Sequence, residues 1–323
     1  MEIFSGTEDI LIDKKSVITF GKFDGLHRGH QKLISYVRKV ANRGLLSLVF
    51  SFTVSPLQVV NSKLSKQIIT NEERKCVMES LGVDCFVEYP FTEQVMKMEA
   101  EDFVEKVLVK KLHIAHAVIG PDFLFGYQRK GDAKLLKKLG QKWGFEVDVL
   151  EKESLKEGVV SSTRIRQMIE AGDMKGAREL LGYPYFLRGQ IVHGRQLGRT
   201  IGLPTLNQIP AKEKLLPPKG VYVTLTKIGN TYYKGISNVG EKPTVDGDFM
   251  GIETHLFDFS KEIYGAYVDV FFLTYLRGEF KFASLEDLKA QIEKDKKKAT
   301  VYLQDNDLKE CLGILSANLF KKP

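Results

Sequence analysis

The sequence predicts two domains, an open α/β domain with a parallel sheet over residues 1–183 and a mainly β domain over residues 184–323. A chain of 323 residues exceeds the usual size of one domain. As far as about residue 150, short apolar runs alternate with segments of helical spacing, which is typical of a parallel sheet covered by helices. After Tyr183 and Pro184, strand-like runs separated by turn residues indicate a small antiparallel barrel or sandwich.

In the first half, the predicted strands are short apolar runs and the predicted helices carry apolar residues three or four positions apart. Thr70 precedes one helix and Glu73 follows three residues later, as in a capping box. Gly172 and Gly182 break the last helical segment. We expect strands over residues 17–20, 45–50, 85–87, 115–119 and 145–149, and helices over residues 31–37, 71–81, 100–111, 134–143 and 161–181.

In the second half, alternating apolar and polar residues predict strands over residues 186–192, 221–228, 232–239, 252–259 and 268–273. Gly229-Asn230 and Asp246-Gly247 are turn signals between them. From Ser284 the pattern becomes helical, with Asp287 completing a cap. We therefore expect the barrel to be followed by a C-terminal helix.

The composition limits the classes of function. The net charge of +7 suits a nucleic-acid binder or an enzyme that handles anionic phosphates, and the basic residues are spread along the chain. The three cysteines form no Cys-x-x-Cys motif, so we expect neither a disulfide framework nor a zinc cluster. The N-terminus does not resemble a signal peptide, and no apolar stretch approaches the ~20 residues of a membrane span. We expect a cytoplasmic protein with no membrane partner.

The first chemically informative stretch runs from Phe20 to His30 and joins a predicted strand to a predicted helix. Gly21 and Gly25 permit a tight turn, and His27 and His30 are three apart, so on a helix they share a face. A helix N-terminus offers unpaired N–H groups to a phosphate. A single histidine is usually structural, and a metal site lacks a third ligand nearby. The pair therefore favours a nucleotide phosphate site.

The second informative stretch runs from His193 to Asn207 and is rich in glycine and arginine. Glycines allow backbone N–H groups to surround phosphates, and the Thr205 hydroxyl can reach a magnesium ion. The stretch is not a Walker loop, because it lacks Gly-Lys-Ser/Thr. On spacing alone, an ordinary loop between barrel strands is also a fair interpretation.

Several motifs together carry a family resemblance. Residues 21–30 resemble the Gly-x-Phe-Asp-Gly-x-His-x-Gly-His signature of nucleotidyltransferases of the HxGH superfamily, and residues 119–126 and 160–166 resemble two further blocks. Residues 194–207 are similar to the riboflavin kinase motif Gly-Arg-x-x-Gly-x-Pro-Thr-Ala-Asn, with Leu206 in place of alanine. In order and spacing, nearly the whole chain resembles the bifunctional riboflavin kinase/FAD synthetase family of bacteria.

The resemblance implies a Rossmann-like first domain that transfers an adenylyl group from ATP to FMN and releases pyrophosphate. Asp122 and Phe123 would contact the flavin, and Ser162, Thr163 and Arg166 would grip the leaving phosphates. His27 and His30 would be catalytic and face the triphosphate. The other ATP-binding residues implied in this domain are Gly21, Phe23, Asp24 and Gly25.

The resemblance also implies a second domain that phosphorylates riboflavin to FMN. Glu253 would be the general base for the 5′-hydroxyl of riboflavin, although a glutamate on a predicted strand is more often simply exposed. Asn238 would contact the flavin, and Thr205 would hold Mg²⁺. The ATP-binding residues implied here are Gly198, Gly202, Thr205 and Asn207.

One departure from the family pattern affects the first domain. Where the family commonly has Thr-Phe-Asp-Pro-His-Pro, this chain has Ser51-Phe52-Thr53-Val54-Ser55-Pro56, so Thr53 and Ser55 replace an aspartate and a histidine. A riboflavin kinase with a weak adenylyltransferase half is therefore an alternative. The charge of +7 motivates another, a flavin-binding regulatory protein acting on nucleic acid, but basic stripes interleaved with aromatics are not evident. We expect ATP, riboflavin, FMN and Mg²⁺ as partners, no nucleic acid, and we leave homo-oligomer formation open.

Overall fold

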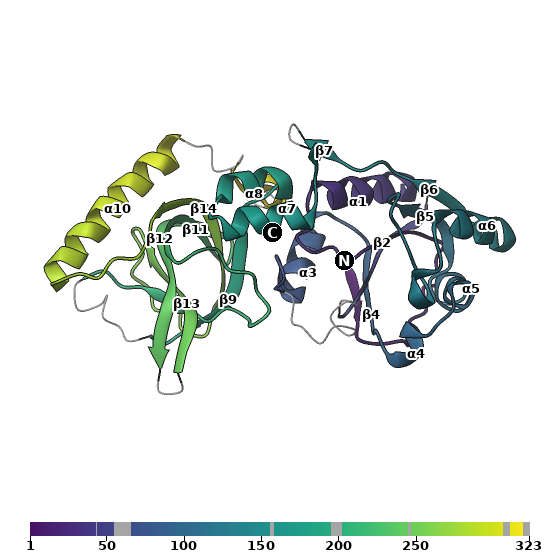
Figure 1. The fold of residues 1–323 in the computed structure, drawn as a ribbon, viewed down its shortest axis with the longest axis horizontal. Coiled ribbons are helices and arrows are strands. Elements are labelled where there is room, and N and C mark those ends of the chain that lie inside the picture. The colour runs from purple at the N-terminus through teal and green to yellow at the C-terminus, as the bar shows by residue number, and fades with distance from the viewer. Residues whose placement is uncertain are drawn as a thin grey trace. The chain divides into compact units, whose positions relative to one another are not determined.

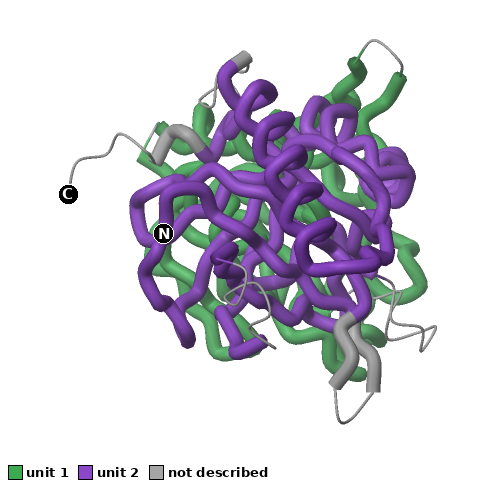
Figure 2. Tube along the Cα trace, turned by 90° about the vertical axis from the view of Figure 1, so that its left-hand side faces the viewer, with its two compact units in different colours: residues 1–65, 74–161 green, residues 66–73, 162–323 purple. Residues whose placement is uncertain are grey.

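The computed structural model of the chain describes residues 1–42, 44–54, 66–155, 158–194, 202–244, 247–305 and 311–318. The chain packs into two compact units, coloured separately in Figure 2. Unit 1 comprises Met1–Ser65 and Arg74–Ser161, and unit 2 comprises Lys66–Glu73 and Ser162–Pro323. The functional domain boundary near residue 183 stays a prediction.

Unit 1 contains a sheet of six strands among the described residues, in the order β1-β4-β3-β2-β5-β6 (Figure 1). Every neighbouring pair is parallel, which confirms the predicted open α/β fold. The strand β1 was not predicted, because its four residues are mostly exposed and carry no apolar run. The strands are β1 (Glu2–Ser5), β2 (Ser16–Phe20), β3 (Leu46–Phe52), β4 (Cys85–Tyr89), β5 (Ile114–Ile119) and β6 (Glu146–Val149).

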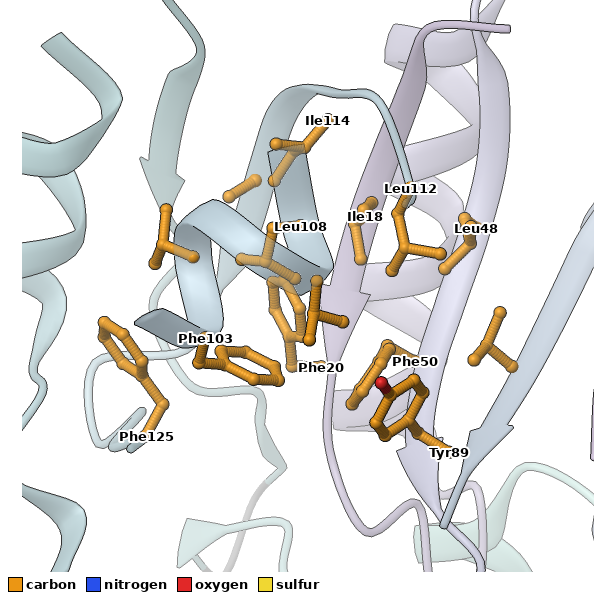
Figure 3. Close-up of a cluster of buried hydrophobic side chains, with 14 of the residues drawn as sticks. Ile18, Phe20, Leu48, Phe50, Tyr89, Phe103, Leu108, Leu112, Ile114 and Phe125 are labelled. Atoms are coloured by element: carbon orange, nitrogen blue, oxygen red, sulfur yellow. The ribbon is translucent and has the colours of Figure 1, made fainter. Parts of the chain in front are cut away.

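Helices cover this sheet on both faces. On β2, Ile18 and Phe20 belong to one buried cluster and Val17 to another, because alternate side chains of a strand point to opposite faces. The larger cluster, shown in Figure 3, joins these two residues to Phe103 and Leu108. The helical segments are α1 (Arg28–Ala41), α3 (Asn71–Ser80, shared with unit 2), α4 (Glu93–Met96), α5 (Ala100–Phe103) with the π-helical turn Val104–Val109, the 3-10 turn Tyr127–Arg129 and α6 (Ala133–Trp143). A small hairpin, β7 (Ser154–Leu155) with β8 (Gly158–Val159), follows.

The strand order has a reversal point between β2 and β5. The chain runs from β2 to β3 and β4 on one side, and then crosses to β5 and β6 on the other. In open parallel sheets, ligands bind beyond the carboxyl ends of the two strands at such a point. Here these ends lead into the glycine-rich turn before α1 and into the segment that carries Asp122.

Unit 2 contains a closed barrel whose described strands follow the order β10-β13-β12-β11-β14-β9 (Figure 1). All of the strand pairs are antiparallel, which confirms the predicted barrel. The short strand β10 was not predicted, because its three residues overlap the end of the glycine- and arginine-rich stretch and show no alternation of their own. The strands are β9 (Phe186–Val192), β10 (Leu206–Gln208), β11 (Gly220–Ile228), β12 (Thr231–Thr244), β13 (Gly247–Leu256) and β14 (Tyr267–Arg277).

The predicted helices of unit 2 are also confirmed. The helices α7 (Ser162–Glu170) and α8 (Met174–Leu181) precede the barrel, and α8 ends at Gly182, whose φ of 79° suits glycine. The helix α10 (Leu285–Asp305) follows it, and the Ser284 hydroxyl caps its start by accepting the Asp287 N–H at 3.1 Å. A 3-10 turn spans Gly313–Asn318.

A fully buried ion pair fixes Lys66–Glu73 within unit 2. The Lys214 Nζ contacts Glu73 Oε2 at 2.5 Å and also donates to the carbonyls of Ile68 and Phe186. The other Glu73 oxygen accepts the Arg188 N–H at 2.9 Å. Glu73 also completes the predicted capping box with Thr70. A buried charge needs this many partners, because the interior solvates it poorly.

We predict that Lys214→Met destabilises unit 2 by about 3–5 kcal/mol, because it leaves the Glu73 carboxylate buried and unpaired. The matched control is Lys219→Met, which breaks the exposed Lys219–Glu241 pair and should cost below about 1 kcal/mol. Urea unfolding followed by circular dichroism measures both. The fluorescence of Trp143, the one tryptophan of the sequence, reports unit 1 separately. Equal stability of the two variants would contradict the prediction.

Candidate active sites

The turn between β2 and α1 has an unusual backbone. Phe23, Gly25 and Leu26 have φ values of 51°, 85° and 38°. Positive φ is costly for residues with a Cβ, so surrounding packing must hold Phe23 and Leu26, and both are fully buried. A Cβ at Gly21 would lie 3.2 Å from the Phe23 ring. The glycine signature of this stretch thus reflects a tightly packed, strained turn of the kind found at functional sites.

A buried ion pair between Arg74 and Glu88 stabilises the same turn. Arg74 donates from Nη1 to the Lys22 carbonyl at 3.0 Å and from Nη2 to Glu88 at 2.6 Å. Burial alone would raise the pKa of Glu88, but the Arg74 hydrogen bond and charge hold it below the usual value. The carboxylate therefore stays ionised and keeps Arg74 against the turn.

The two predicted histidines stack on each other at the start of α1. Their ring centroids are 3.7 Å apart with an interplanar angle of 17°, and the Phe23 ring lies edge-on to His30 at 5.1 Å. His27 is the N-cap residue of α1, and a Cβ at Gly29 would lie 3.3 Å from its ring. The two rings therefore lie together as predicted, although His27 precedes the helix with an extended backbone, and Gly29 leaves room for its ring.

Both imidazoles are neutral near pH 7. Burial lowers the pKa of His27 to about 4, and burial together with the neighbouring His27 lowers the pKa of His30 well below its ordinary value. The Nδ1 atoms of both rings are buried and have no partner in the described structure. Buried polar atoms in native proteins are nearly always satisfied, so two of them at a helix N-terminus favour a ligand with hydrogen-bonding oxygens.

The segment after β5 lies next to the turn. The Phe123 ring packs on Phe20, the last residue of β2, with centroids 5.2 Å apart. Asp122 is exposed and forms an ion pair with Lys152, which follows β6. Sequence reasoning missed Lys152. A cation shortly after a strand that ends at the same edge of the sheet was the available signal.

The remaining residues predicted for adenylyl transfer are less informative. Asp24 and Gly25 are buried within the turn. Ser162, Thr163 and Arg166 lie at the start of α7, and by packing they belong to unit 2, so their role in the leaving-phosphate site stays a prediction. Thr53 donates its backbone N–H to the Tyr89 carbonyl at 3.0 Å. Ser55 and Gly198 lie outside the described residues.

The residues predicted for the kinase site converge on the barrel. In the register of the antiparallel strands, Glu253 on β13 lies opposite Asn207 on β10 and opposite Asn238 on β12. Paired residues of antiparallel strands point to the same face, so these side chains form a row. The Thr205 hydroxyl donates to Glu253 Oε1 at 2.6 Å. The structure thus brings together Thr205, Asn207, Asn238 and Glu253, which lie up to 48 positions apart.

Two neighbours of this row were not among the predicted site residues. Glu279 accepts a hydrogen bond from the Asn238 amide at 3.0 Å, while Asn238 Oδ1 is buried without a partner in the described structure. Gly194 has a steric role, because a Cβ there would lie 2.5 Å from the Asn207 amide nitrogen. No local pattern links positions 238 and 279, so only the fold could identify Glu279 as a neighbour of this site.

A cleft opens beside Thr205 and Asn207. Its open space, counted out into the surrounding solvent, is about 620 Å³. Its other wall is the loop after β13, where Tyr264 stacks on His193 with ring centroids 3.8 Å apart. The exposed Gly202, with a φ of 75°, lies three residues before Thr205. The lining residues are Pro204–Asn207, Leu256 and Phe259–Tyr264.

The donors around the cleft fit a magnesium ion. Thr205 offers a hydroxyl and Asn207 an amide oxygen, and Mg²⁺ prefers oxygen ligands. The described residues include no cluster of three histidine, cysteine or acidic side chains suited to a metal. Mg²⁺ is commonly bound by one or two protein ligands together with substrate phosphates.

Two candidate sites, one in each unit, are typical of an enzyme that handles nucleotide phosphates in two places. A family model described as FAD synthetase matches residues 9–164, and one described as riboflavin kinase matches residues 181–303. The bifunctional riboflavin kinase/FMN adenylyltransferase of Escherichia coli (strain K12) is 37% identical over 284 residues, covering 86% of this chain and 90% of the relative. That of Bacillus subtilis (strain 168) is 36% identical over 298 residues, covering 90% and 93%. The chain belongs to the family of bifunctional riboflavin kinase/FMN adenylyltransferases, which confirms the resemblance of its motifs.

A solved structure supports the fold. A crystal structure from Streptococcus pneumoniae, titled a macrolide-efflux protein, matches with a TM-score of 0.82 and 33% identity, covering 92% of this chain and 98% of that one. Its title describes that protein alone. In the part of the chain that the structure describes, no helix is both long and apolar enough to cross a membrane.

We predict that unit 1 loses stability as the pH falls from about 6.5 to about 4. Over this range the unfolded chain binds a proton at His27, whose folded pKa is about 4, and the folded chain does not. His27 alone should account for about 3 kcal/mol, and His30 adds to the loss. Urea unfolding followed by Trp143 fluorescence tests this in the wild type and in His27→Asn. The variant should show the smaller pH dependence, and equal slopes would contradict the prediction.

Proposed function

We propose that this chain phosphorylates riboflavin with ATP to give FMN and then transfers the adenylyl group of a second ATP to FMN, giving FAD and pyrophosphate. The observation that carries the proposal is the row of Asn207, Glu253 and Asn238 with Thr205 bound to Glu253. It lies within the part of the chain that matches the riboflavin kinase model, while the histidine turn lies within the part that matches the FAD synthetase model.

In the kinase step, the 5′-hydroxyl of riboflavin attacks the γ-phosphorus of ATP and ADP leaves. Glu253 accepts the hydroxyl proton, and Asn238 orients the flavin beside it. The cleft next to Thr205 and Asn207 receives ATP. When bound there with Thr205, Mg²⁺ supplies positive charge to the phosphate oxygens. The hydrogen bond from Thr205 to Glu253 keeps these two groups together before substrates arrive.

In the adenylyl step, a phosphate oxygen of FMN attacks the α-phosphorus of ATP and pyrophosphate leaves. No covalent intermediate is needed, so positioning and charge stabilisation supply the rate. His27 and His30, together with the backbone N–H groups at the start of α1, bind the triphosphate. A neutral imidazole can donate one N–H to a phosphate oxygen without needing a proton from solvent. Asp122 and Phe123 contact FMN, and Ser162, Thr163 and Arg166 hold the leaving phosphates.

We further propose that the protein acts in the cytoplasm on small molecules alone, without nucleic acid. Its substrate ATP is available there, and a reducing compartment keeps the thiols of Cys76, Cys85 and Cys311 reduced. Whether it assembles into homo-oligomers stays open to measurement.

The direct test is to incubate the protein with riboflavin, ATP and Mg²⁺ and to separate the flavins by chromatography over time. We expect FMN to appear first and FAD to follow. FMN without FAD would reduce the function to a riboflavin kinase, which the replacements at Thr53 and Ser55 make the natural alternative. The absence of both products would overturn the proposal.

We predict that Glu253→Gln slows riboflavin phosphorylation by about 10²–10⁴-fold, because the amide cannot accept the hydroxyl proton. The same variant should convert FMN to FAD at nearly the wild-type rate. The control Glu241→Gln removes an exposed carboxylate of β12 that pairs with Lys219, and it should leave both steps unchanged. An active Glu253→Gln kinase would remove Glu253 from the proposed mechanism.

We predict the opposite selectivity for His30→Ala. Loss of one preorganised donor at the triphosphate should slow FAD formation by about 10²–10³-fold, while FMN formation continues. The control is His113→Asn, which changes an exposed histidine and retains a residue tolerant of its φ of 44°. Equal losses in both steps would show that the two sites are not independent.

A further inference from the structure

We propose that His255 is a positioning residue of the riboflavin kinase site. Its imidazole holds the Pro204 carbonyl and thereby fixes the adjacent Thr205 against Glu253. The proposal rests on the function proposed for that site. Motif matching and the proposed mechanism leave His255 without a role, although it lies on the same face of β13 as Glu253, two residues further along.

The hydrogen bond between His255 and Pro204 defines which nitrogen of the imidazole carries the proton. His255 Nδ1 lies 3.0 Å from the Pro204 carbonyl oxygen, and the side chain is buried, with 8% exposed. A carbonyl oxygen can only accept, so Nδ1 must carry the proton. The imidazole thus acts as a fixed donor to the backbone rather than as a base.

The Pro204 carbonyl lies outside the regular strand pairing. The ladder between β10 and β13 begins with Leu206 opposite Thr254, so Pro204 lies two residues before it. Proline has no N–H and cannot extend a ladder as a donor. The His255 imidazole donates to the Pro204 carbonyl just beyond the last regular strand pair. This hydrogen bond links the segment before β10 to β13.

Two hydrogen bonds then determine where Thr205 lies. The first joins the Pro204 carbonyl to His255, and the second joins the Thr205 hydroxyl to Glu253 at 2.6 Å. Their partners on β13 are two residues apart, about 6.7 Å along the strand. Attachment at two points fixes a short segment in orientation as well as position. Loss of the first bond would let Thr205 move while every group that touches substrate remains.

The expected effect follows from how strongly catalysis depends on position. A displacement of about 1 Å can reduce the rate of an enzyme by about 100-fold. We therefore expect His255→Leu to reduce kcat of riboflavin phosphorylation about 10- to 100-fold and to raise the Mg²⁺ concentration needed for half-maximal rate. The KM for riboflavin should change less, because His255 bonds to Pro204 and not to a residue proposed to contact the flavin.

A purely structural role is the competing explanation. The His255 ring also packs near Phe257, with centroids 6.0 Å apart. Leucine retains most of that apolar contact but cannot donate. Asparagine places an N–H group close to the position of Nδ1, so His255→Asn should restore kcat to within about fivefold of the wild type if the hydrogen bond is what matters.

A matched control separates lost stability from lost positioning. Tyr222→Phe removes another hydrogen bond of the barrel, which the buried Tyr222 hydroxyl donates to the Pro218 carbonyl at 2.6 Å. Tyr222 lies on β11, and its ring packs against Phe272 and Tyr275. This variant should lower Tm about as much as His255→Leu does while leaving kcat of FMN formation unchanged.

The experiment measures FMN formation, FAD formation from added FMN, and Tm for the wild type and the three variants. ¹⁵N NMR of histidine-labelled protein adds a readout independent of activity, and it should show His255 in the Nδ1–H tautomer. The expected result is a kinase defect in His255→Leu, its recovery in His255→Asn and normal FAD formation in both. A fully active His255→Leu, equal defects in His255→Leu and His255→Asn, or the Nε2–H tautomer would overturn the proposal. A wild type that makes no FMN would instead refute the proposed function.

Discussion

Burial of charge is the constraint on which much of this structure depends. Lys214 and Glu73 are both removed from water, and each is stable there only because the other, together with surrounding carbonyl and N–H groups, replaces the lost solvent. Satisfying that pair fixes Lys66–Glu73, a stretch from the first part of the sequence, within the barrel unit. In unit 1, Arg74 and Glu88 meet the same requirement and hold the turn that carries the histidines.

The two sites solve the problem of handling phosphates in different ways. The first uses backbone geometry, since a strained turn at the reversal point of a parallel sheet presents neutral histidines and a helix N-terminus. The second uses the register of antiparallel strands, which aligns Asn207, Glu253 and Asn238 without unusual backbone at those residues. Adenylyl transfer mainly requires that the two substrates be bound and oriented, whereas phosphorylation of an alcohol also requires a base. Unit 1 accordingly carries neutral histidines that can bind phosphate oxygens, and unit 2 carries a carboxylate that can act as a base.

Local patterns predicted most of the fold and part of each site. Apolar periodicity predicted both architectures, and the spacing of His27 and His30 predicted that they share a face. Two short strands were missed. The four residues of β1 are mostly exposed, and the three residues of β10 overlap a sequence motif, so neither shows an alternation of apolar and polar residues. Contacts between distant residues were out of reach. Glu73 was predicted as part of a cap, but its partner Lys214 lies 141 positions away, and the same limit applies to Glu279 beside Asn238.

The central claim is that one chain carries out two chemically distinct transfers from ATP, each in its own site. The most direct measurement follows labelled phosphorus from ATP into the flavins. With γ-labelled ATP and riboflavin, the account predicts label in FMN and in the FAD made from it. With α-labelled ATP, it predicts label in FAD and none in FMN, because only the adenylyl step transfers the α-phosphorus. Label from the α-position in FMN, or FAD formed without it, would contradict the account.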